Sequence, residues 1–383
     1  METQIDFLQR LEPDMALKVL MSLDDSADLI RASAVSRYWQ TIVISNGLSK
    51  QLFVKRYPKL ANISSVIELS HNSETAGDDP PSDAMERVVG ERDHRAYSSL
   101  FRAITVFPQT YCICRAVSAS STDNYPEESI ALTLDPREKV LYRDLYWSSK
   151  GSDDPETPEI LIYKLTSNLC VITEINMHPF QASFHLDSPI YSSRFVRFRS
   201  GHPKCWKEMD YNFMEEGKCA NDLFIWTYTS EVFPVAQENR LQRFQLPEPV
   251  VCVGGYLQIE LLGRVLCEID AKYYICVAHV QAIGRQLSPA FCVEFSEPSN
   301  AITLKYDAEE FVRIMHNVSN GQIDSLSPSV LPVENHRHLV WANLQDFMML
   351  DAALDDVAEP EWVDDDDDDD ELDYDETDPI FII

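Results

Sequence analysis

Cysteine and histidine pairs are the first residues to consider, because both residue types bind metal ions. Cys112 and Cys114 are separated by one residue, and so are His336 and His338. A zinc site usually needs a second pair at a set distance along the chain, and neither pair has one. We therefore interpret the cysteines as neighbours on a strand and the histidines as part of a surface loop, and we expect no metal ion.

Sequence patterns typical of an active site are absent as well. The chain has no Gly-rich phosphate loop after a strand and no Gly-x-Ser-x-Gly turn that would expose a nucleophile. Carboxylates are plentiful, but the sequence does not indicate which of them pair. We expect no catalytic residues and no cofactor, and hence a protein that is not itself an enzyme.

The composition is that of a folded protein in a reducing compartment. The 383 residues are enough for two or three domains, with 45% hydrophobic and 25% charged residues. No apolar run is long enough to span a bilayer, and the N-terminal METQIDFLQR lacks a secretion signal. The nine cysteines have no paired spacing that suggests disulfides. We expect a location in the cytoplasm, the nucleus or both, and no membrane partner.

The negative charge is concentrated at the C-terminal end. Residues 351–383 contain 17 acids and no base, whereas the rest of the chain contains 46 acids and 32 bases. Neither part favours binding to the phosphates of nucleic acids. Seven consecutive aspartates repel one another, so we expect a disordered acidic tail over 351–383. Such a tail either keeps the protein soluble or contacts a basic partner or a basic patch of the same chain.

The elements that position any binding surface begin with short helices near the N-terminus. Apolar residues recur at steps of three and four, as on one face of a helix, at Leu11, Met15, Val19, Leu20 and Leu23. Capping residues follow at positions 24–26, and a second apolar series predicts two further short helices with Leu29, Ile30, Val35, Trp39 and Ile42. About forty residues bury too little surface to be stable alone. This unit therefore needs a neighbouring domain or a partner protein.

The chain changes character after these helices. A further helix is predicted over 48–57, then a polar connector over 59–95, and then one or two helical turns from Tyr97 to Ile104. From residue 111 to 295, several short apolar or alternating runs predict an all-β sandwich or barrel, namely 169–177, 194–198, 222–228, 256–263 and 273–284. The continuous run 222–228 is typical of a central strand. Residues 301–306 predict one more strand and 308–317 one more helix.

The N-terminal helices resemble the F-box. This module docks a substrate receptor onto the Skp adaptor of a cullin-based ubiquitin ligase. The residues in the register of the family pattern are Leu11, Asp14, Met15, Val19, Leu20, Leu23, Leu29, Val35, Arg37 and Trp39. The chain departs from the pattern at Glu12, where the family has proline; Pro13 follows and suits the first turn of a helix. The alternative is an ordinary helical subdomain that packs on the rest of the protein.

The β region resembles a galactose-binding-like jelly roll. The segments that carry this resemblance are 146–165, Met177 to Phe180, the strand after Arg194, and the run from Gly254 to Gly263. Discoidin-type carbohydrate modules and the Doc-domain subunit of the anaphase-promoting complex share this architecture. The whole order, an F-box followed by such a sandwich, is similar to a group of plant F-box proteins.

These patterns together predict an α+β multidomain chain. We expect an all-α F-box module over 5–58, a linker over 59–95, an all-β jelly-roll sandwich that binds the substrate over 96–345, and the acidic tail over 351–383. The resemblance implies a non-catalytic substrate-recognition subunit of a Skp-cullin-F-box ubiquitin ligase. Its partners would be a Skp-family adaptor, through it a cullin, and a protein substrate. The alternative is a carbohydrate- or small-ligand-binding module whose N-terminal helices are only structural.

The resemblance implies an adaptor-binding face on the helices. The residues expected there are Pro13, Met15, Val19, Leu20, Leu23, Leu29, Val35 and Trp39. Burial of exposed apolar side chains against the adaptor would stabilise the complex by roughly 25 cal/mol per Å². Val35 and Trp39 could equally hold the helices together.

A second binding surface is expected where loops gather at one end of the sandwich. The candidate substrate-binding residues are Trp147, Ser148, Ser149, Lys150, His202, Lys204, Tyr228 and Glu231. The alternative for Trp147 is a core tryptophan at the start of a strand. For the residues in turns, the alternative is plain exposure to solvent.

Overall fold

The structure of the chain is a computed structural model that describes residues 6–69, 82–137, 139–140, 143–185, 187–206, 220–296 and 301–321. These ranges all belong to one unit of the chain, Met1–Arg337. The predicted tail over 351–383 and the pair His336 and His338 lie outside the described residues. In the described part of the chain, no helix is both long and apolar enough to cross a membrane.

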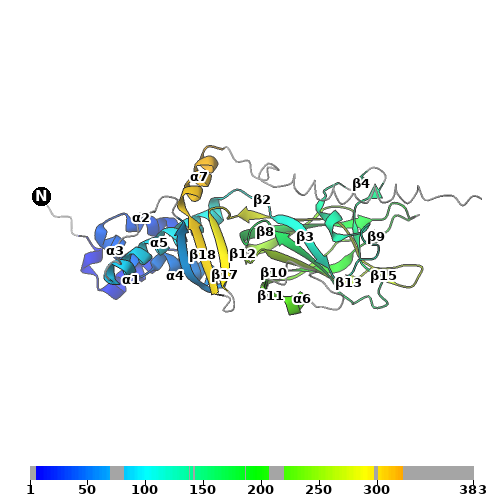
Figure 1. Cartoon of the computed structure of the whole chain (residues 1–383), viewed down its shortest axis with the longest axis horizontal. Coiled ribbons are helices and arrows are strands. Elements are labelled where there is room, and N and C mark those ends of the chain that lie inside the picture. Colours follow the sequence, from blue (N-terminus) through cyan, green and yellow to red (C-terminus); the bar gives the residue numbers. More distant parts are fainter. Residues whose placement is uncertain are drawn as a thin grey trace, which may run out of the picture. The chain divides into compact units, whose positions relative to one another are not determined.

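The N-terminal helices form where the apolar spacing predicts them (Figure 1). Their bounds are η1 Leu8–Arg10, α1 Pro13–Met21, α2 Ser26–Ser33, α3 Arg37–Ser45, α4 Leu48–Arg56 and η2 Pro58–Leu60. Side-chain caps start two of them, since Asp25 accepts from the Ala27 N–H at 2.9 Å and Ser36 from the Trp39 N–H at 3.3 Å. The helices share a small core of Leu8, Ala16, Leu20, Leu29, Ala32, Val43, Leu48 and Leu52.

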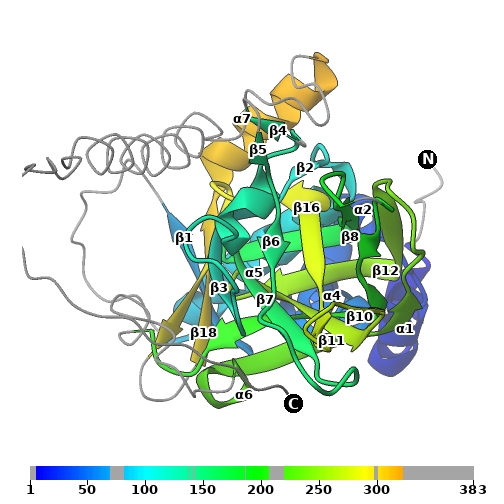
Figure 2. The same cartoon turned by 90° about the vertical axis from the view of Figure 1, so that its right-hand side faces the viewer.

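Two antiparallel sheets pack face to face and form the predicted sandwich (Figure 2). The five-stranded sheet has the order β11-β10-β13-β7-β3. Its bounds are β3 Ile113–Ala119, β7 Glu159–Leu165, β10 Ser193–Pro203, β11 Phe224–Pro234 and β13 Tyr256–Arg264. The other sheet has the order β12-β8-β16-β2, with β6 and β9 added to β16 and β8. Its bounds are β2 Thr110–Tyr111, β6 Trp147–Ser148, β8 Leu169–Gln181, β9 Ile190–Tyr191, β12 Gln242–Val253 and β16 Cys276–Gln286.

Short elements complete the region of the sandwich. They are η3 Ile130–Leu134, β4 Lys139–Val140, β5 Arg143–Asp144, α6 Ala220–Leu223, β14 Leu266–Cys267 and β15 Tyr273–Tyr274. The alternation predicted in β13 is confirmed, because Leu257, Ile259 and Leu261 enter the core between the sheets. Gln258 and Glu260 point to the opposite face, where they too are buried. The predicted order of an all-α unit followed by an antiparallel β-sandwich is therefore present.

The central strand predicted over 222–228 is wrong in its start and its position. Residues up to Leu223 belong to α6, and β11 begins at Phe224. β11 pairs with β10 and lies at the edge of its sheet. Its apolar run has another cause, because the Phe224 and Trp226 rings stack at 4.8 Å and cover the outer face beside Tyr256.

A separate three-stranded sheet has the order β1-β18-β17, and its strands pair with one another and not with those of the sandwich. Its bounds are β1 Ile63–Leu69, β17 Phe291–Ser296 and β18 Ala301–Asp307, and it is accompanied by the helices α5 Ser82–Val106 and α7 Ala308–Ser319. β1 is parallel to β18, and β17 is antiparallel to it. The strand predicted over 301–306 and the helix predicted over 308–317 are confirmed as β18 and α7.

The predicted connector over 59–95 is wrong over two of its stretches. Residues 63–69 form β1, and residues 82–95 are the first half of α5. The polar composition of 82–95 misled the sequence interpretation, because this half of α5 is largely exposed and needs few apolar residues to be helical. β18 lies within the predicted 96–345 domain and pairs with β1, so the predicted boundary at residue 95 divides one sheet.

A hydrophobic core joins the helices, the small sheet and the sandwich. Phe53 of α4 lies 5.5 Å from Tyr97 and 6.5 Å from Phe101 of α5, measured between ring centroids. The same core contains residues from β8, β12, β17 and β18, including Leu169, Val171, Val251, Val253, Phe291, Val293 and Leu304. The helical unit is therefore connected to the sandwich by packing as well as by the chain.

Loss of the Phe53 ring should destabilise the whole described fold. Phe53 is completely buried, so the substitution Phe53→Ala leaves a cavity and should lower the free energy of unfolding by about 3–5 kcal/mol. Urea denaturation followed by circular dichroism measures this change. The exposed Phe184 provides the control, since Phe184→Ala should change stability little. Equal effects of both substitutions would contradict the shared core.

Three histidines are buried in full or in part: His202 and His279 are buried, and His94 is half-buried. Burial lowers the pKa of His94, His202 and His279 below the ordinary value of 6.5. His94 lies between α5 and α4, where its Nδ1 is 2.7 Å from the Ser49 Oγ. As the pH falls through 6.5, these histidines take up protons in the unfolded chain before they do so in the folded chain.

Stability should therefore fall as the pH drops below 6.5. Urea denaturation at about pH 7.5 and about pH 5.5 measures this, with the lower free energy of unfolding expected at the lower pH. The variant His279→Gln should reduce the difference, whereas His316→Gln, at an exposed position of α7, should leave it unchanged. Wild-type protein that is as stable at the lower pH would show that burial of these side chains does not set the dependence.

Candidate functional site

The helical unit exposes apolar side chains next to its own core. Met15 and Val19 lie one turn apart on α1 and are 49% and 40% exposed. On the other side of the same helix, Ala16 and Leu20 are buried in the core. Val35, between α2 and α3, is 61% exposed. Exposed apolar side chains on a small unit whose core is already filled make this unit a candidate surface for a protein partner.

Asp6 and Trp39 tie the start of the chain to α3. The Trp39 Nε1–H donates to both Asp6 carboxylate oxygens, at 2.8 and 2.9 Å, and the Ser36 hydroxyl donates to Asp6 at 3.2 Å. The hydrogen bond from Trp39 is the largest cause that lowers the pKa of Asp6. The Phe7 and Trp39 rings pack edge to face, with their centroids 5.3 Å apart. Trp39 therefore holds the helices together, which is one of the two roles predicted for it.

A buried polar network occupies one end of the sandwich. Arg264 is 1% exposed and forms an ion pair with Glu159. Its Nη1 also donates to the Ser149 Oγ at 3.0 Å and to the Tyr273 carbonyl at 2.8 Å. The Ser121 hydroxyl donates to Glu159 at 2.8 Å. Each charge is paired and hydrogen-bonded, as the burial of charge requires, so this network is structural.

The predicted substrate-binding residues 147–150 lie at this same end. Trp147 is fully buried, and its Nε1 donates to the Ser121 carbonyl at 3.1 Å. It is therefore the core tryptophan that the sequence left as the alternative. Ser148 and Ser149 are buried too, so neither is available to a substrate. Lys150 is exposed.

The other four candidates do not join them. Ser193 at the start of β10 pairs with Arg264, whereas His202 lies near the end of the same strand. Nine residues of strand separate the two ends by about 30 Å. Lys204 follows β10, and Tyr228 and Glu231 lie within β11. The prediction that these residues gather at one end of the sandwich is therefore wrong, because the antiparallel strands carry them to opposite ends and to an edge.

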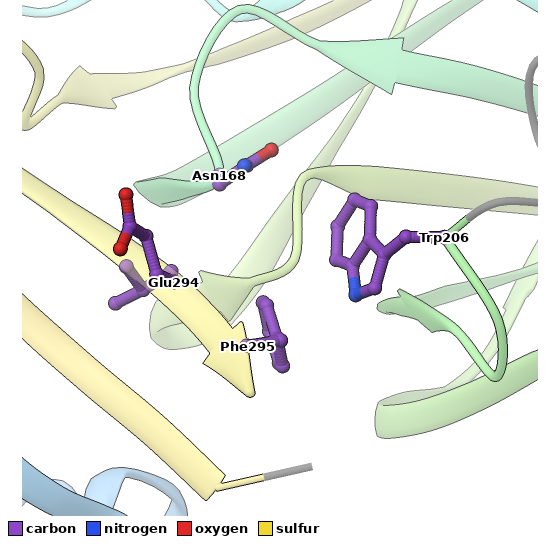
Figure 3. A pocket seen from close by; sticks show the side chains of 5 residues that line it. Asn168, Trp206, Glu294 and Phe295 are labelled. Carbon is purple, nitrogen blue, oxygen red and sulfur yellow. The ribbon is translucent and has the colours of Figure 1, made fainter. Parts of the chain in front are cut away.

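A pocket lies at the His202 end, between the β7–β8 turn and β17 (Figure 3). It is lined by Asn168, Trp206, Val293, Glu294 and Phe295. The Phe295 ring lies 5.1 Å from Trp206 and 4.6 Å from His202, measured between centroids. Apart from its neighbour His202, the sequence analysis did not find this pocket, since its residues come from three distant segments.

A lysine with an unusual environment lies behind this pocket. Burial lowers the pKa of Lys164 to about 8. Its Nζ donates to the Asn168 Oδ1 at 2.8 Å and to the Gly254 carbonyl at 3.3 Å, and it lies 4.1 Å from the centre of the Tyr256 ring. None of the ion pairs in the described ranges includes Lys164.

Metal-binding geometry is not found among the described residues, where no three His, Cys, Asp or Glu side chains are placed to hold an ion. Cys112 is buried in the core of the sandwich, and burial raises the pKa of its thiol. Such a thiol stays protonated and is a poor metal ligand. The pair His336 and His338 lies outside the described residues.

Comparison with known proteins decides the family. No protein-family model matches the chain. F-box protein At4g00755 of Arabidopsis thaliana is 45% identical over 309 residues, which cover 79% of this chain and 82% of that protein. The chain belongs to the F-box protein family. The resemblance inferred from the N-terminal residues is confirmed at this level.

Solved structures similar to part of this F-box protein include carbohydrate-binding domains and allantoicases. CBM32-3 of a family 31 glycoside hydrolase from Clostridium perfringens is 12% identical, with a TM-score of 0.30, over 45% of this chain and 90% of that one. The family 32 CBM of C. perfringens NanJ, in complex with galactose, is 10% identical, with a TM-score of 0.30, over 46% of this chain and 98% of that one. A fucolectin from striped bass serum is 12% identical, with a TM-score of 0.30, over 49% of this chain and 57% of that one.

The eight residues expected to bind the adaptor divide into three groups on the F-box. Pro13, Met15, Val19 and Val35 are exposed. Leu23 and Trp39 are half-buried and pack against the core of the helical unit. Leu20 and Leu29 are 2% and 1% exposed, so the prediction that they contact a partner is wrong; they support the exposed face from inside. The sequence analysis missed Phe7 as an exposed apolar residue, which lies before the first predicted helix.

Breaking the Arg264–Glu159 ion pair should destabilise this F-box protein strongly. The variant Glu159→Gln leaves the Arg264 charge buried without its partner, and we expect the free energy of unfolding to fall by about 3–5 kcal/mol. The exposed pair of Arg194 and Glu156, at 3.3 Å, offers a matched control. Glu156→Gln should cost less than about 1 kcal/mol in the same urea denaturation. A similar loss in the free energy of unfolding at both sites would show that the buried ion pair stabilises the fold no more than the exposed one.

Proposed function

We propose that this F-box protein is the substrate-recognition subunit of a Skp-cullin-F-box ubiquitin ligase. Its helical unit docks on a Skp-family adaptor, and its β region presents a protein target. The observation that carries the proposal is the exposure of Met15 and Val19 on the outer side of α1, opposite the buried Ala16 and Leu20. A helix that divides in this way buries one side in its own unit and leaves the other for a partner.

The energetics support a partner on this face. Exposed apolar side chains gain stability on burial at roughly 25 cal/mol per Å², and a few central side chains usually dominate an interface. Pro13 starts α1 beside these residues, and Val35 follows α2. The core that holds α4 and α5 against β8 and β12 supports a receptor in which adaptor and target are held by one packed body.

The proposed role places ubiquitin transfer on other subunits, so the chain needs no catalytic residue of its own. We place the protein in the cytoplasm, the nucleus or both. The thiols support such a reducing compartment, because none of the eight cysteines in the described part of the chain is in a disulfide.

The adaptor face can be tested without disturbing the core. The double variant Met15→Asp with Val19→Asp puts two charges on the exposed side of α1, and retention of a Skp adaptor in co-purification should fall by more than about tenfold, since each lost contact at an interface centre costs about 1–2 kcal/mol. Leu20 is unsuitable because a charge there would unfold the helices.

A matched control is available in the β region. Val232→Asp with Ile269→Asp charges two apolar residues that are also exposed, and this variant should retain the adaptor fully. Circular dichroism should show both double variants folded. If folded Met15→Asp with Val19→Asp still retains the adaptor at the wild-type ratio, the proposed docking face is wrong.

A further inference from the structure

A half-buried lysine without an acid partner lies behind the pocket beside Phe295. The Lys164 Nζ donates two of its three N–H groups, to the Asn168 Oδ1 at 2.8 Å and to the Gly254 carbonyl at 3.3 Å. No ion pair in the described ranges includes Lys164, although the whole chain has 63 acids and 32 bases. Partial removal of a cation from water costs free energy, and an anion beside it offsets this cost.

The other charges that the described residues place at this pocket are positive or already paired. Arg115 lies opposite Lys164 in the β3–β7 register, and after burial its charge is the next cause that lowers the pKa of the lysine. Glu294 lines the pocket, but it forms an ion pair with Lys305. Neighbouring residues of a strand point to opposite faces, and Figure 3 shows the Glu294 carboxylate directed away from Phe295. The charge left for a ligand is therefore positive.

The pocket combines hydrogen-bond donors with apolar walls. The Trp206 Nε1 is buried and has no hydrogen-bond partner among the described residues. Asn168 uses its side-chain oxygen to accept from Lys164, which leaves its amide N–H groups for another acceptor. The Phe295 and Trp206 rings, with centroids 5.1 Å apart, form the apolar side. Because Asn168, Trp206 and Phe295 are only half-buried, the pocket is open to solvent.

The size and chemistry of the pocket fit the last residue of a peptide chain. Its volume is about 240 Å³, below the ~300–1,000 Å³ typical of small-molecule sites. One unpaired lysine with neutral donors matches the single charge of a carboxylate, whereas phosphate groups are recognised by clusters of arginines. The aromatic walls ask for an apolar group as well. A C-terminal residue supplies both, since it carries a carboxylate and a side chain on the same Cα.

We propose that the pocket beside Phe295 binds the C-terminal residue of a protein target. The terminal carboxylate pairs with Lys164 and accepts from the donors of Asn168 and Trp206, and an apolar side chain packs against the Phe295 ring. Capture of a C-terminal carboxylate is one of the recurring modes of peptide recognition. That the protein so bound is a ubiquitination target rests on the proposed function, whereas the carboxylate site itself does not.

The first experiment uses only the full-length wild-type protein. A pool of random N-acetylated hexapeptides with a free C-terminal carboxylate, and the same pool with a C-terminal amide, are each incubated with it, and retained peptides are identified by mass spectrometry. We expect peptides with an apolar last residue to be retained from the acid pool and none from the amide pool. Equal retention from both pools, or from neither, would overturn the proposal. Retention of amides that share an internal acid would also overturn it, because the pocket would then take an acidic side chain.

The second experiment tests the contact between the carboxylate and Lys164. Lys164→Gln removes the charge and should weaken a selected acid peptide at least about tenfold, as loss of a charge-assisted hydrogen bond does. The same variant should bind the amide form of that peptide as weakly as the wild type does, because the amide forms no ion pair. An equal loss for both forms contradicts the contact, since a merely distorted pocket weakens both. Lys272→Gln, at an exposed lysine, is the matched control and should change neither affinity.

Two further measurements separate this inference from the proposed function. Met15→Asp with Val19→Asp should bind the selected acid peptides as the wild type does, and Lys164→Gln should retain the Skp adaptor. Peptide binding that needs the free carboxylate, in a wild-type chain that retains no adaptor, would uphold the pocket and remove the ligase role. Adaptor retention by a chain that selects no acid peptide would remove the pocket and leave the ligase role.

Discussion

The helices and the sandwich are joined through the burial of Phe53 against Tyr97 and Phe101. α4 contributes Leu48 and Leu52 to the core of the helical unit and Phe53 to the core shared with β8 and β12. One helix thus belongs to two hydrophobic cores, which a helix achieves when its apolar residues cover more than one face. A helical unit of this size is marginal alone, and the second core supplies the burial that it lacks.

The parallel pairing of β1 with β18 decides which strand lies at the edge of the small sheet. β1 and β18 are adjacent in the sheet although Ile63 and Ile302, which face each other across the pair, lie far apart in the chain. β1 occupies one side of β18 and β17 the other, so β17 is left at an edge. Exposed edges usually carry devices that prevent further pairing. Here the edge is covered instead, since Phe291 and Val293 of β17 are 0% and 2% exposed and belong to the core shared with β8 and β12.

The sequence predicts local periodicity well and long-range placement poorly. The spacing of Met15, Val19 and Leu20 predicts a helix and its apolar sides, but it does not say which side meets a partner, since Leu20 is buried and Met15 is exposed. The alternation of Leu257 and Gln258 predicts a strand correctly. The connector failed because β1 pairs with β18, which lies far along the chain, and because the first half of α5 is largely exposed and has a polar composition. The loop candidates failed because the sequence does not show at which end of the sandwich Trp147 and His202 lie, and the topology carries them to opposite ends.

The two candidate surfaces ask for chemically different partners. The face of α1 offers apolar area and few polar groups, so burial against another apolar surface is its main gain. The pocket beside Phe295 offers the Trp206 donor, so its gain comes from a hydrogen bond that an acceptor supplies. A partner suited to one surface leaves the polar groups or the apolar area of the other unsatisfied. Because the chemistry of the two surfaces differs, a partner that suits one of them does not compete for the other.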